Sequence, residues 1–382
     1  MREGWTYKKL GEVATFVNDG DWIESKDQSD KGIRLVQTGN VGNGIFKSKE
    51  DKPHFISEET MSRLGCTEIF EGDCLVSRLP DPVGRACLIP NTGCRMITAV
   101  DCSIIRFGNN YIPKFFVDYS QSSRYRNSID NNTTGTTRKR ISRKNLEKIP
   151  IPVPPIPEQE RIVSELDLIS SIIEKKKAQL KELDNLAQSI FYDMFGDPVT
   201  NEKGWEVKKL ENVSTLINGR AYKQDELLGE GKYKVLRVGN FFTNSNYYYS
   251  DLELEDNKYC DNGDLLFAWS ASFGAFIWNG EKVIYHYHIW KVLYDEEQLN
   301  KMFYCYLLNT MTNTFMNDVH GIGMVHLTKQ GMEQYNLPLP PLSLQQQFAE
   351  KIEAIEHQKE LIKQSVTETE TLFNSRMDYY FN

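Results

Sequence analysis

No stretch of this chain approaches the roughly 20 consecutive apolar residues that a membrane-spanning helix needs. Its first residues, Met1 to Trp5, also lack the apolar run of a secretory signal peptide. We therefore expect a cytoplasmic protein. With 382 residues the chain is longer than one hydrophobic core usually serves, so at least two domains are expected.

Patterns typical of metal binding are missing as well. The seven cysteines form no C-x-x-C pair and have no companion histidine cluster, so we predict no metal site and interpret the cysteines as buried, reduced thiols. The formal net charge of −8 argues against a protein that coats nucleic acid by bulk positive charge. It leaves local basic surfaces possible, because phosphate binding depends on where lysine and arginine lie.

Catalytic motifs are scarce. No Walker sequence is present, and Gly321-Ile322-Gly323 lacks the third glycine and the preceding strand of a cofactor-binding turn. Val153 to Ile156 contains the two prolines of an adenine methyltransferase loop without its flanking polar and aromatic residues. Pro80-Asp81 has no Glu-x-Lys follower of the kind found in metal-dependent nucleases. We predict that the chain is not an enzyme.

What the chain does contain is a long internal repeat. The segment Gly4 to Thr15 returns as Gly204 to Thr215 with the same glycine, tryptophan, paired lysines, leucine, valine and threonine. The Pro-rich stretch Ile149 to Ile156 returns as Tyr335 to Leu342 at a shorter separation, which places insertions in loops of the first copy. Short β-branched and aromatic runs between turn residues predict a strand-rich domain in each copy. The Pro-rich stretch is interpreted as a stiff boundary, with a proline-rich recognition motif as the alternative.

A long amphipathic helix is expected after each Pro-rich stretch. Apolar residues recur every seven positions from Leu166 onward, with Lys176 as one polar interruption, and a weaker stripe diluted by Lys359 and Thr369 follows Phe348. A narrow apolar stripe on a charged helix needs a partner helix. The residues predicted to pair the helices are Leu166, Ile169, Ile173, Leu180, Leu183, Ile190, Ile352, Ile355, Ile362, Val366 and Phe373.

If the two copies are arranged equivalently, the helices must run antiparallel, because the first leads away from domain one and the second leads back. The predicted fold class is α+β: two similar strand-rich domains separated by two long helices that form an antiparallel coiled coil with a pseudo-twofold internal repeat. The predicted domains are residues 1–155 and 198–341, with helices in 156–197 and 342–382. Roughly 37 helical residues span about 55 Å, which suits a ruler between two short blocks of a bipartite DNA target.

Several motifs together resemble the specificity subunits of type I restriction-modification systems. They are Gly-Trp-x-x-x-x-Leu-x-x-Val at each domain start, the segment Ile151 to Ile162, the helix end Phe191 to Pro198, and Trp269 to Gly274. The likeness covers nearly the whole chain. A departure is Ser343 to Gln347, which replaces the Pro-Glu-Gln-Glu-Arg of the first copy.

The resemblance implies two target-recognition domains, each reading one half of a split double-stranded DNA sequence. It further implies that two modification (methyltransferase) subunits attach to the helices and that restriction subunits complete the nuclease. S-adenosylmethionine, ATP and Mg²⁺ are then expected on the partner subunits, and no cofactor in this chain. A coiled-coil scaffold that binds only proteins is the alternative, although it assigns no function to the duplicated domains.

The best local candidate for DNA contact is a basic run in the first copy, with a solvated basic loop as the alternative. Arginine can contact phosphate and can also grip guanine with two hydrogen bonds. The run contains Arg124, Arg126, Thr136, Thr137, Arg138, Lys139, Arg140, Arg143, Lys144 and Lys148, and the corresponding loop of the second copy contains His320.

Other candidates come from three places that recur in both copies. Asp21, Trp22, Arg220, Tyr222 and Lys223 follow the shared opening segment. A second group lies at the end of a strand, and its asparagines have the alternative of being turn residues: Gln37, Thr38, Asn40, Arg237 and Asn240. A third group follows later in each copy, and its Trp269 has the alternative of being a core residue: Arg78, Arg85, Trp269, Ser270, Ser272 and His288.

Overall fold

The structure is a computed structural model of residues 1–382, and it describes all of them except 1–3, 136–137, 243–245, 271 and 318–326. It divides into two compact units. Unit 1 comprises Met1–Lys177 and Gln364–Asn382, and unit 2 comprises Ala178–Lys363. Each unit therefore contains one copy of the strand-rich repeat and one section of each long helix.

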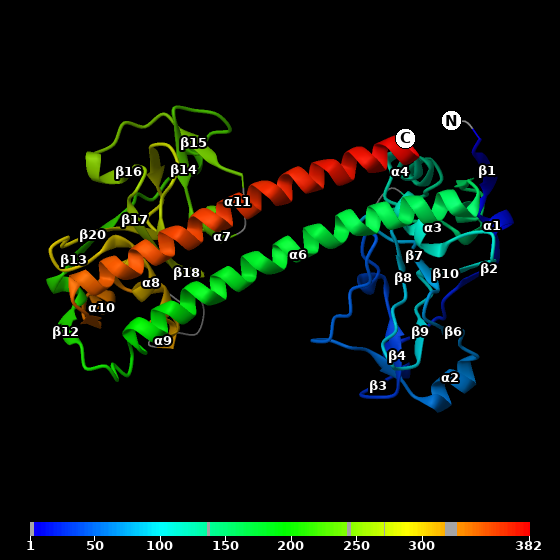
Figure 1. Cartoon of the computed structure of the whole chain (residues 1–382), viewed down its shortest axis with the longest axis horizontal. Coiled ribbons are helices and arrows are strands. Elements are labelled where there is room, and N and C mark those ends of the chain that lie inside the picture. The colour runs from blue at the N-terminus through cyan, green and yellow to red at the C-terminus, as the bar shows by residue number, and fades with distance from the viewer. Residues whose placement is uncertain (1–3, 136–137, 243–245, 271, 318–326) are drawn as a thin grey trace. The chain divides into compact units, whose positions relative to one another are not determined.

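Two helices of equal length follow the two Pro-rich strands. Helix α6 spans Ile156–Phe195 and α11 spans Leu342–Phe381, 40 residues each, and Figure 1 shows both as unbroken coils. Forty helical residues correspond to about 60 Å. Helix α6 stops before Gly196, which has a φ of 74° and so takes the left-handed conformation that ends many helices.

The two helices pair antiparallel within both units. In unit 1, Lys177 of α6 binds Glu370 of α11 with an Nζ–Oε1 distance of 2.9 Å. In unit 2, Asp184 of α6 binds Lys359 of α11 with an Oδ1–Nζ distance of 2.6 Å. Unit 1 also pairs Glu165 with Arg376, and unit 2 also pairs Phe191 with Phe348, with ring centroids 5.7 Å apart. Within each unit, therefore, the partner numbers on α11 fall as those on α6 rise, which is the antiparallel order. The residues predicted to pair the helices are buried or half-buried throughout: Leu166, Ile169, Ile173, Leu180, Leu183, Ile190, Ile352, Ile355, Ile362, Val366 and Phe373.

The described residues of unit 1 form three sheets. Strands β1 and β11 pair antiparallel, a four-stranded sheet has the order β2-β10-β7-β8, and a five-stranded sheet has the order β3-β5-β4-β9-β6 with β4 parallel to β9. The strands are β1 Thr6–Lys9, β2 Ala14–Asp19, β3 Gln28–Ser29, β4 Ile33–Val36, β5 Phe55–Ile56, β6 Glu68–Ile69, β7 Cys74–Ser77, β8 Ala86–Leu88, β9 Met96–Thr98, β10 Cys102–Phe107 and β11 Pro150–Val153.

Unit 2 repeats this plan. Strand β12 pairs with β21, a four-stranded sheet has the order β13-β20-β17-β18, and another has the order β15-β14-β19-β16 with β14 parallel to β19. The strands are β12 Glu206–Lys209, β13 Ser214–Asn218, β14 Tyr233–Leu236, β15 Tyr248–Ser250, β16 Tyr259–Cys260, β17 Leu265–Ser270, β18 Ser272–Ile277, β19 Val283–Tyr285, β20 Ile289–Tyr294 and β21 Asn336–Leu339.

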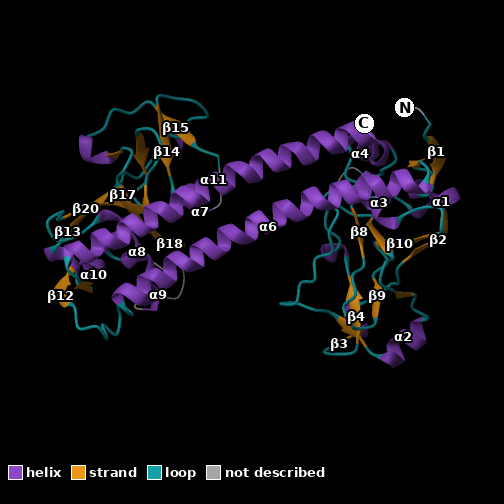
Figure 2. Ribbon diagram, viewed as in Figure 1, coloured by secondary structure: helices purple, strands orange, loops and turns teal. Residues whose placement is uncertain are grey.

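Short helices cover the sheets of each unit, as Figure 2 shows in purple against orange strands. In unit 1 they are α1 Leu10–Val13, α2 Glu58–Leu64, α3 Pro113–Tyr119, α4 Ser123–Asn131 and α5 Arg143–Leu146, with 3-10 turns at Ser25–Asp27 and Thr38–Asn40. In unit 2 they are α7 Val238–Phe242, α8 Lys301–Thr310, α9 Thr312–Asn317 and α10 Lys329–Glu333, with 3-10 turns at Leu210–Asn212, Gln224–Glu226 and Asp256–Lys258.

Each unit has an aromatic core that joins its sheet to its section of the long helices. In unit 1, Phe115 of α3 packs on Trp5 and on Phe381 of α11, with ring centroids 5.9 and 5.4 Å away. In unit 2, Phe303 of α8 packs on Phe191 of α6, at 6.0 Å. Trp5 and Phe381 also touch, at 6.4 Å, so the two ends of the chain meet in unit 1. The predicted fold class is confirmed.

Candidate nucleic-acid interface

Both units fold the segment after their opening strand in the same way. Gly20 follows β2 and Gly219 follows β13, and a Cβ on either glycine would lie 2.3 Å from a carbonyl oxygen, that of Thr98 or that of Tyr285. The residue after each glycine donates its N–H to the same carbonyl, at 2.9 Å in unit 1 and 3.0 Å in unit 2. Only glycine permits so close an approach, so the two predicted loops are structurally equivalent.

This equivalence brings two candidate side chains to one matching position. Arg78 follows β7 and Trp269 lies near the end of β17. The N–H of Arg78 donates to the carbonyl of Asp101 at 2.8 Å, and the N–H of Trp269 donates to the carbonyl of His288 at 3.1 Å. We call the surroundings of this position the charged site in unit 1, comprising Asp19, Arg78, Asp101, Arg140 and Arg143. In unit 2 we call it the aromatic site, comprising Asn218, Trp269, Tyr287, His288, Trp290, Leu327, Thr328 and Lys329.

The charged site is a network of ion pairs. Nη1 of Arg78 lies 3.2 Å from Oδ2 of Asp19, and Nη2 of Arg140 lies 3.0 Å from Oδ1 of Asp101. Arg78 is buried and burial lowers its pKa, whereas Arg140 is exposed. Arg143, on α5, is half-buried. The exposed guanidinium of Arg140 can contact a phosphate, and the carboxylate beside it can accept a hydrogen bond from the amino group of cytosine.

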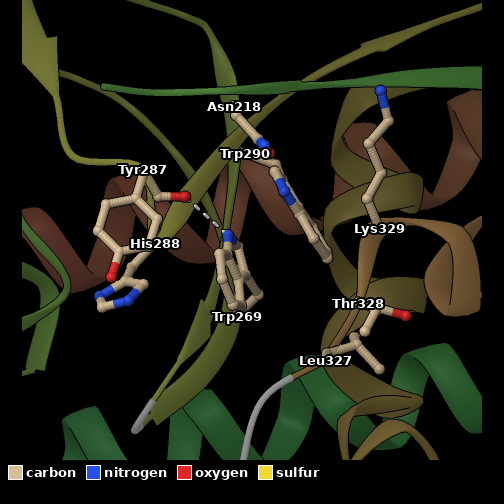
Figure 3. A pocket seen from close by; sticks show the side chains of 8 residues that line it. All are labelled: Asn218, Trp269, Tyr287, His288, Trp290, Leu327, Thr328 and Lys329. Carbon is tan, nitrogen blue, oxygen red and sulfur yellow. Dashed lines mark hydrogen bonds between the residues drawn. The ribbon is translucent and has the colours of Figure 1, made fainter. Parts of the chain in front are cut away.

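The aromatic site surrounds a cavity of about 370 Å³, shown in Figure 3. The rings of Trp269 and Trp290 stack at 5.3 Å with an interplanar angle of 18°. The indole Nε1 of Trp269 donates to the carbonyl of Tyr287 at 2.9 Å. The Nε1 of Trp290 is buried and has no hydrogen-bond partner in the part of the chain that the structure describes. Aromatic walls with few polar groups are typical of a site for a planar ligand.

The neighbouring loop of unit 2 fixes two further candidates. Arg220 binds the carboxylate of Glu226 through both terminal nitrogens, at 2.9 and 2.7 Å, and this pairing lowers the pKa of Glu226 to about 2. The ring of Tyr222 stacks on His286 at 6.4 Å. Burial, with help from His288 and an arginine, lowers the pKa of His286 to about 4, so this imidazole is neutral at physiological pH.

The strand-end asparagines act as turn residues in both units. Oδ1 of Asn40 accepts the N–H of Gln37 at 2.9 Å, and Oδ1 of Asn240 accepts the N–H of Arg237 at 2.8 Å. This is the alternative that the sequence left open, and it uses one of the two lone pairs of each side-chain amide oxygen. Gln37 and Asn40 also line a polar cavity of about 330 Å³ in unit 1, together with residues that include Arg34, Lys49, Lys52 and His54.

Arg85 has a structural role in this conformation. Its guanidinium donates to the carbonyl oxygens of Thr38, Val41, Leu79 and Pro82 at 2.6 to 2.9 Å, and the side chain is 7% exposed. Each of its three nitrogens donates to a carbonyl oxygen, so it holds the loop between β7 and β8 in place rather than presenting an edge to DNA. Ser270 of unit 2 is also buried.

Part of the basic run is accessible. Arg138, Lys139 and Arg140 are exposed, and Thr134 and Arg140 close the run into a small loop by exchanging backbone hydrogen bonds at 2.9 Å. Trp22 is 69% exposed, Lys223 is exposed and Ser272 is half-buried, while Asp21 accepts the N–H of Thr67 at 2.7 Å. Thr136, Thr137 and His320 lie outside the described residues.

Eight residues of these sites escaped the sequence analysis: Asp19 and Asp101 in unit 1, and Asn218, Tyr287, Trp290, Leu327, Thr328 and Lys329 in unit 2. Asp19 and Asn218 stand immediately before the matching glycines, so the aligned repeat contained a signal for them. No comparable signal marked Trp290, because a buried tryptophan in a strand resembles any core residue.

The described residues include no helix with both the length and the apolar character of a membrane span. They also include no group of three histidine, cysteine, aspartate or glutamate side chains placed to hold a metal ion.

Comparison with known proteins gives one consistent result. The family model described as type I restriction modification DNA specificity domain matches residues 2–184 and again 202–371. Relatives include the MjaVIII specificity subunit of Methanocaldococcus jannaschii, 24% identical over 60% of this chain and 60% of that protein. The StySPI specificity subunit of Salmonella potsdam is 23% identical over 98% of this chain and 87% of its own length. The match to a third, the EcoBI specificity subunit of Escherichia coli, spans 32% of that subunit, so the first relatives are covered only in part.

Solved structures show the same fold. A chain from a structural study of complex assembly and conformational transition in the type I R-M system has a TM-score of 0.61 at 17% identity, with 100% of this chain and 98% of that chain covered. The S subunit of a type I restriction-modification system from M. genitalium has a TM-score of 0.55 at 12% identity, with 98% and 95% covered.

Proposed function

Because this chain belongs to the type I restriction modification DNA specificity domain family, we propose that it is the DNA-reading specificity subunit of a type I restriction-modification enzyme. Each unit then reads one half of a bipartite double-stranded target. The chain performs no catalysis itself. Methyltransferase subunits supply S-adenosylmethionine chemistry, restriction subunits supply ATP- and Mg²⁺-dependent steps, and the complex works in the cytoplasm, where the DNA lies.

One observation carries this proposal: the same backbone position holds different chemistry in the two units. Arg78 and Trp269 occupy matching places, as do Asp101 and His288, although the strands around them superpose in order and direction. A duplicated scaffold with divergent side chains at one loop cluster is what two half-sites of different sequence require. A scaffold that bound only proteins would have no need for this divergence.

The test is a domain exchange. Residues 1–150 are replaced by the matching segment of a relative with a known target, and methylated positions in the host genome are located by single-molecule sequencing. We expect one half of the methylated sequence to change and the other half and the gap to remain. The reciprocal exchange of residues 204–336 should change the opposite half.

Two results would count against the proposal. A change in both halves after a single exchange would contradict independent reading by the two units. Failure of the complete complex, with its methyltransferase subunits, to retain any duplex DNA at low salt would favour the scaffold function instead.

A further inference from the structure

We propose that the aromatic site of unit 2 is a receptor for one nucleobase turned out of the DNA stack, an inference that rests on the proposed function. The residues that would contact the base or its phosphate are Asn218, Trp269, Trp290 and Lys329. The site is then a place where this chain holds an unstacked base of the half-site that unit 2 reads.

The first argument is that the fold does not require this cavity. In unit 1 the matching place is occupied by the ion pair of Arg78 with Asp19, and Ser103, which corresponds to Trp290, donates to Asp19 at 2.9 Å. The matching position thus carries an ion pair in unit 1 and borders a cavity of about 370 Å³ in unit 2.

The second argument is the unsatisfied donor. Trp290 is 1% exposed and lines the cavity, and its indole N–H meets no acceptor among the described residues. A buried donor without a partner costs roughly as much as a lost hydrogen bond, so a ligand that brings an acceptor gains that amount. Every nucleobase carries ring-nitrogen or carbonyl acceptors on its edges.

The third argument is the composition of the walls and rim. Figure 3 shows the ring of Trp290 beside Asn218, with Trp269 on one side and Lys329 on the other. Trp290 already stacks on Trp269 and Phe267, so Trp269 is the ring that offers a face for a base to stack on. The amide of Asn218 is exposed and offers a donor and an acceptor for a base edge. Lys329 is exposed at the start of α10, where its ammonium lies 3.6 Å from Oε1 of Glu333, and this group suits the phosphate of a turned-out nucleotide.

Size is consistent with this occupant. A water molecule takes about 30 Å³ of liquid volume, so the cavity is far larger than one solvent site, and it falls within the range of about 300–1,000 Å³ typical of small-molecule pockets. A base held by stacking and edge hydrogen bonds in such a pocket is how proteins generally accommodate extruded nucleotides.

The experiment uses the complete complex and duplexes that carry its own target. A mispaired base is introduced singly at each position of both half-sites, and the dissociation constant is measured by fluorescence anisotropy. Mispairing lowers the cost of turning a base out, so a receptor site binds such duplexes more tightly. We expect a gain of about tenfold at one position of the unit 2 half-site.

Three variants assign that gain to the aromatic site. Trp290→Phe replaces the indole by a smaller aromatic ring without the N–H, and Asn218→Ala changes only an exposed side chain, so at least one of the two should fold normally. Each should abolish the gain at that position. Trp278→Phe is the matched control, because its indole N–H bonds the carbonyl of Glu281 at 2.8 Å outside the cavity. It should reproduce the wild-type profile.

The outcomes are distinct. Methyltransferase subunits also turn out the base they modify, so a gain that survives in Trp290→Phe and Asn218→Ala belongs to them and overturns the proposal. Weaker binding for every mispair in the unit 2 half-site, which indicates reading of stacked bases in a groove, also overturns it. Absence of any target preference in the wild-type complex would instead overturn the proposed function and this inference with it.

Discussion

The ammonium group of Lys176 on α6 lies 2.8 Å from the hydroxyl oxygen of Thr369 on α11, both within unit 1. The same ammonium lies 2.7 Å from the hydroxyl oxygen of Ser365. Two of the three polar residues that interrupt the apolar stripes in the sequence, Lys176 and Thr369, are therefore partners across the helix pair. A polar pair inside an apolar seam favours one register of two helices over others.

Removing this pairing should destabilise unit 1. Thr369→Val keeps the shape and deletes the acceptor, and we expect a loss of about 1 kcal/mol in unfolding free energy, measured by urea denaturation. Lys176→Met combined with Thr369→Val should recover most of the loss, since both seam positions are then apolar. Thr371→Val, on the exposed face of α11, is the matched control. Equal effects of the two threonine variants would show that Lys176 gains nothing from Thr369.

Two buried glutamines attach the long helices to their domains, and substituting them should reduce stability far more than substituting their neighbours. Oε1 of Gln159 accepts the N–H of Ile112 at 2.8 Å and its Nε2 donates to the carbonyl of Pro154 at 2.8 Å, and Gln345 makes the matching bonds in unit 2. Gln159→Leu leaves both buried groups unsatisfied and should cost about 2–3 kcal/mol in thermal or chemical unfolding. Exposed Gln346→Leu should cost less than about 0.5 kcal/mol.

The exposed basic loop of unit 1 should contribute to the salt dependence of DNA binding. If Arg138 contacts phosphate, Arg138→Gln should reduce the slope of log Kobs against log salt by about 0.9. Arg140→Gln should have a smaller effect, because Asp101 already neutralises part of its charge. Arg95→Gln makes the same charge change at a residue held by Glu58 and Glu68. Identical slopes for Arg138→Gln and Arg95→Gln would show that the basic loop does not contact DNA phosphates.

Acidification should weaken unit 2 through His286. Its pKa is lowered from 6.5 to about 4 by burial and by nearby His288 and Arg237, so the folded state favours the neutral imidazole. The unfolded state binds the proton more readily, and this contribution to stability is therefore complete above pH 6.5 and is lost as the pH falls through 4. The wild-type protein should lose up to about 3 kcal/mol relative to His286→Gln between these pH values. Parallel stability curves for the two proteins would contradict the buried neutral state.

Much of the architecture follows from local patterns. The heptads from Leu166 onward and the duplicated segment at Gly204 predict paired helices and two similar domains, because each pattern depends on residues near one another in the chain. The antiparallel direction also follows, since a helix that leaves one copy and a helix that leaves the other can meet along their seams only in opposite directions. The sequence did not decide whether Asn40 and Asn240 are turn residues, and the structure shows that the side chain of each accepts a backbone N–H within its turn.

The candidate sites required long-range contacts. Arg78 and Arg85 lie in the same short segment, and no local sequence pattern distinguishes them. In the structure Arg85 donates hydrogen bonds to four carbonyl groups, whereas Arg78 lies in the charged site. The cavity beside Trp290 exists because β13, β17, β20 and the residues before α10 converge there from distant parts of the chain.

The amino-acid sequence by itself thus determined the repeat, the helical seams and the kind of chemistry available, since periodicity and composition are written along the chain. Tertiary structure alone decided which polar groups are satisfied internally and which face open space, because burial and hydrogen bonding depend on residues far apart in sequence. For that reason the matching positions of Arg78 and Trp269, one filled by an ion pair and one beside a cavity, become visible only once both units are folded.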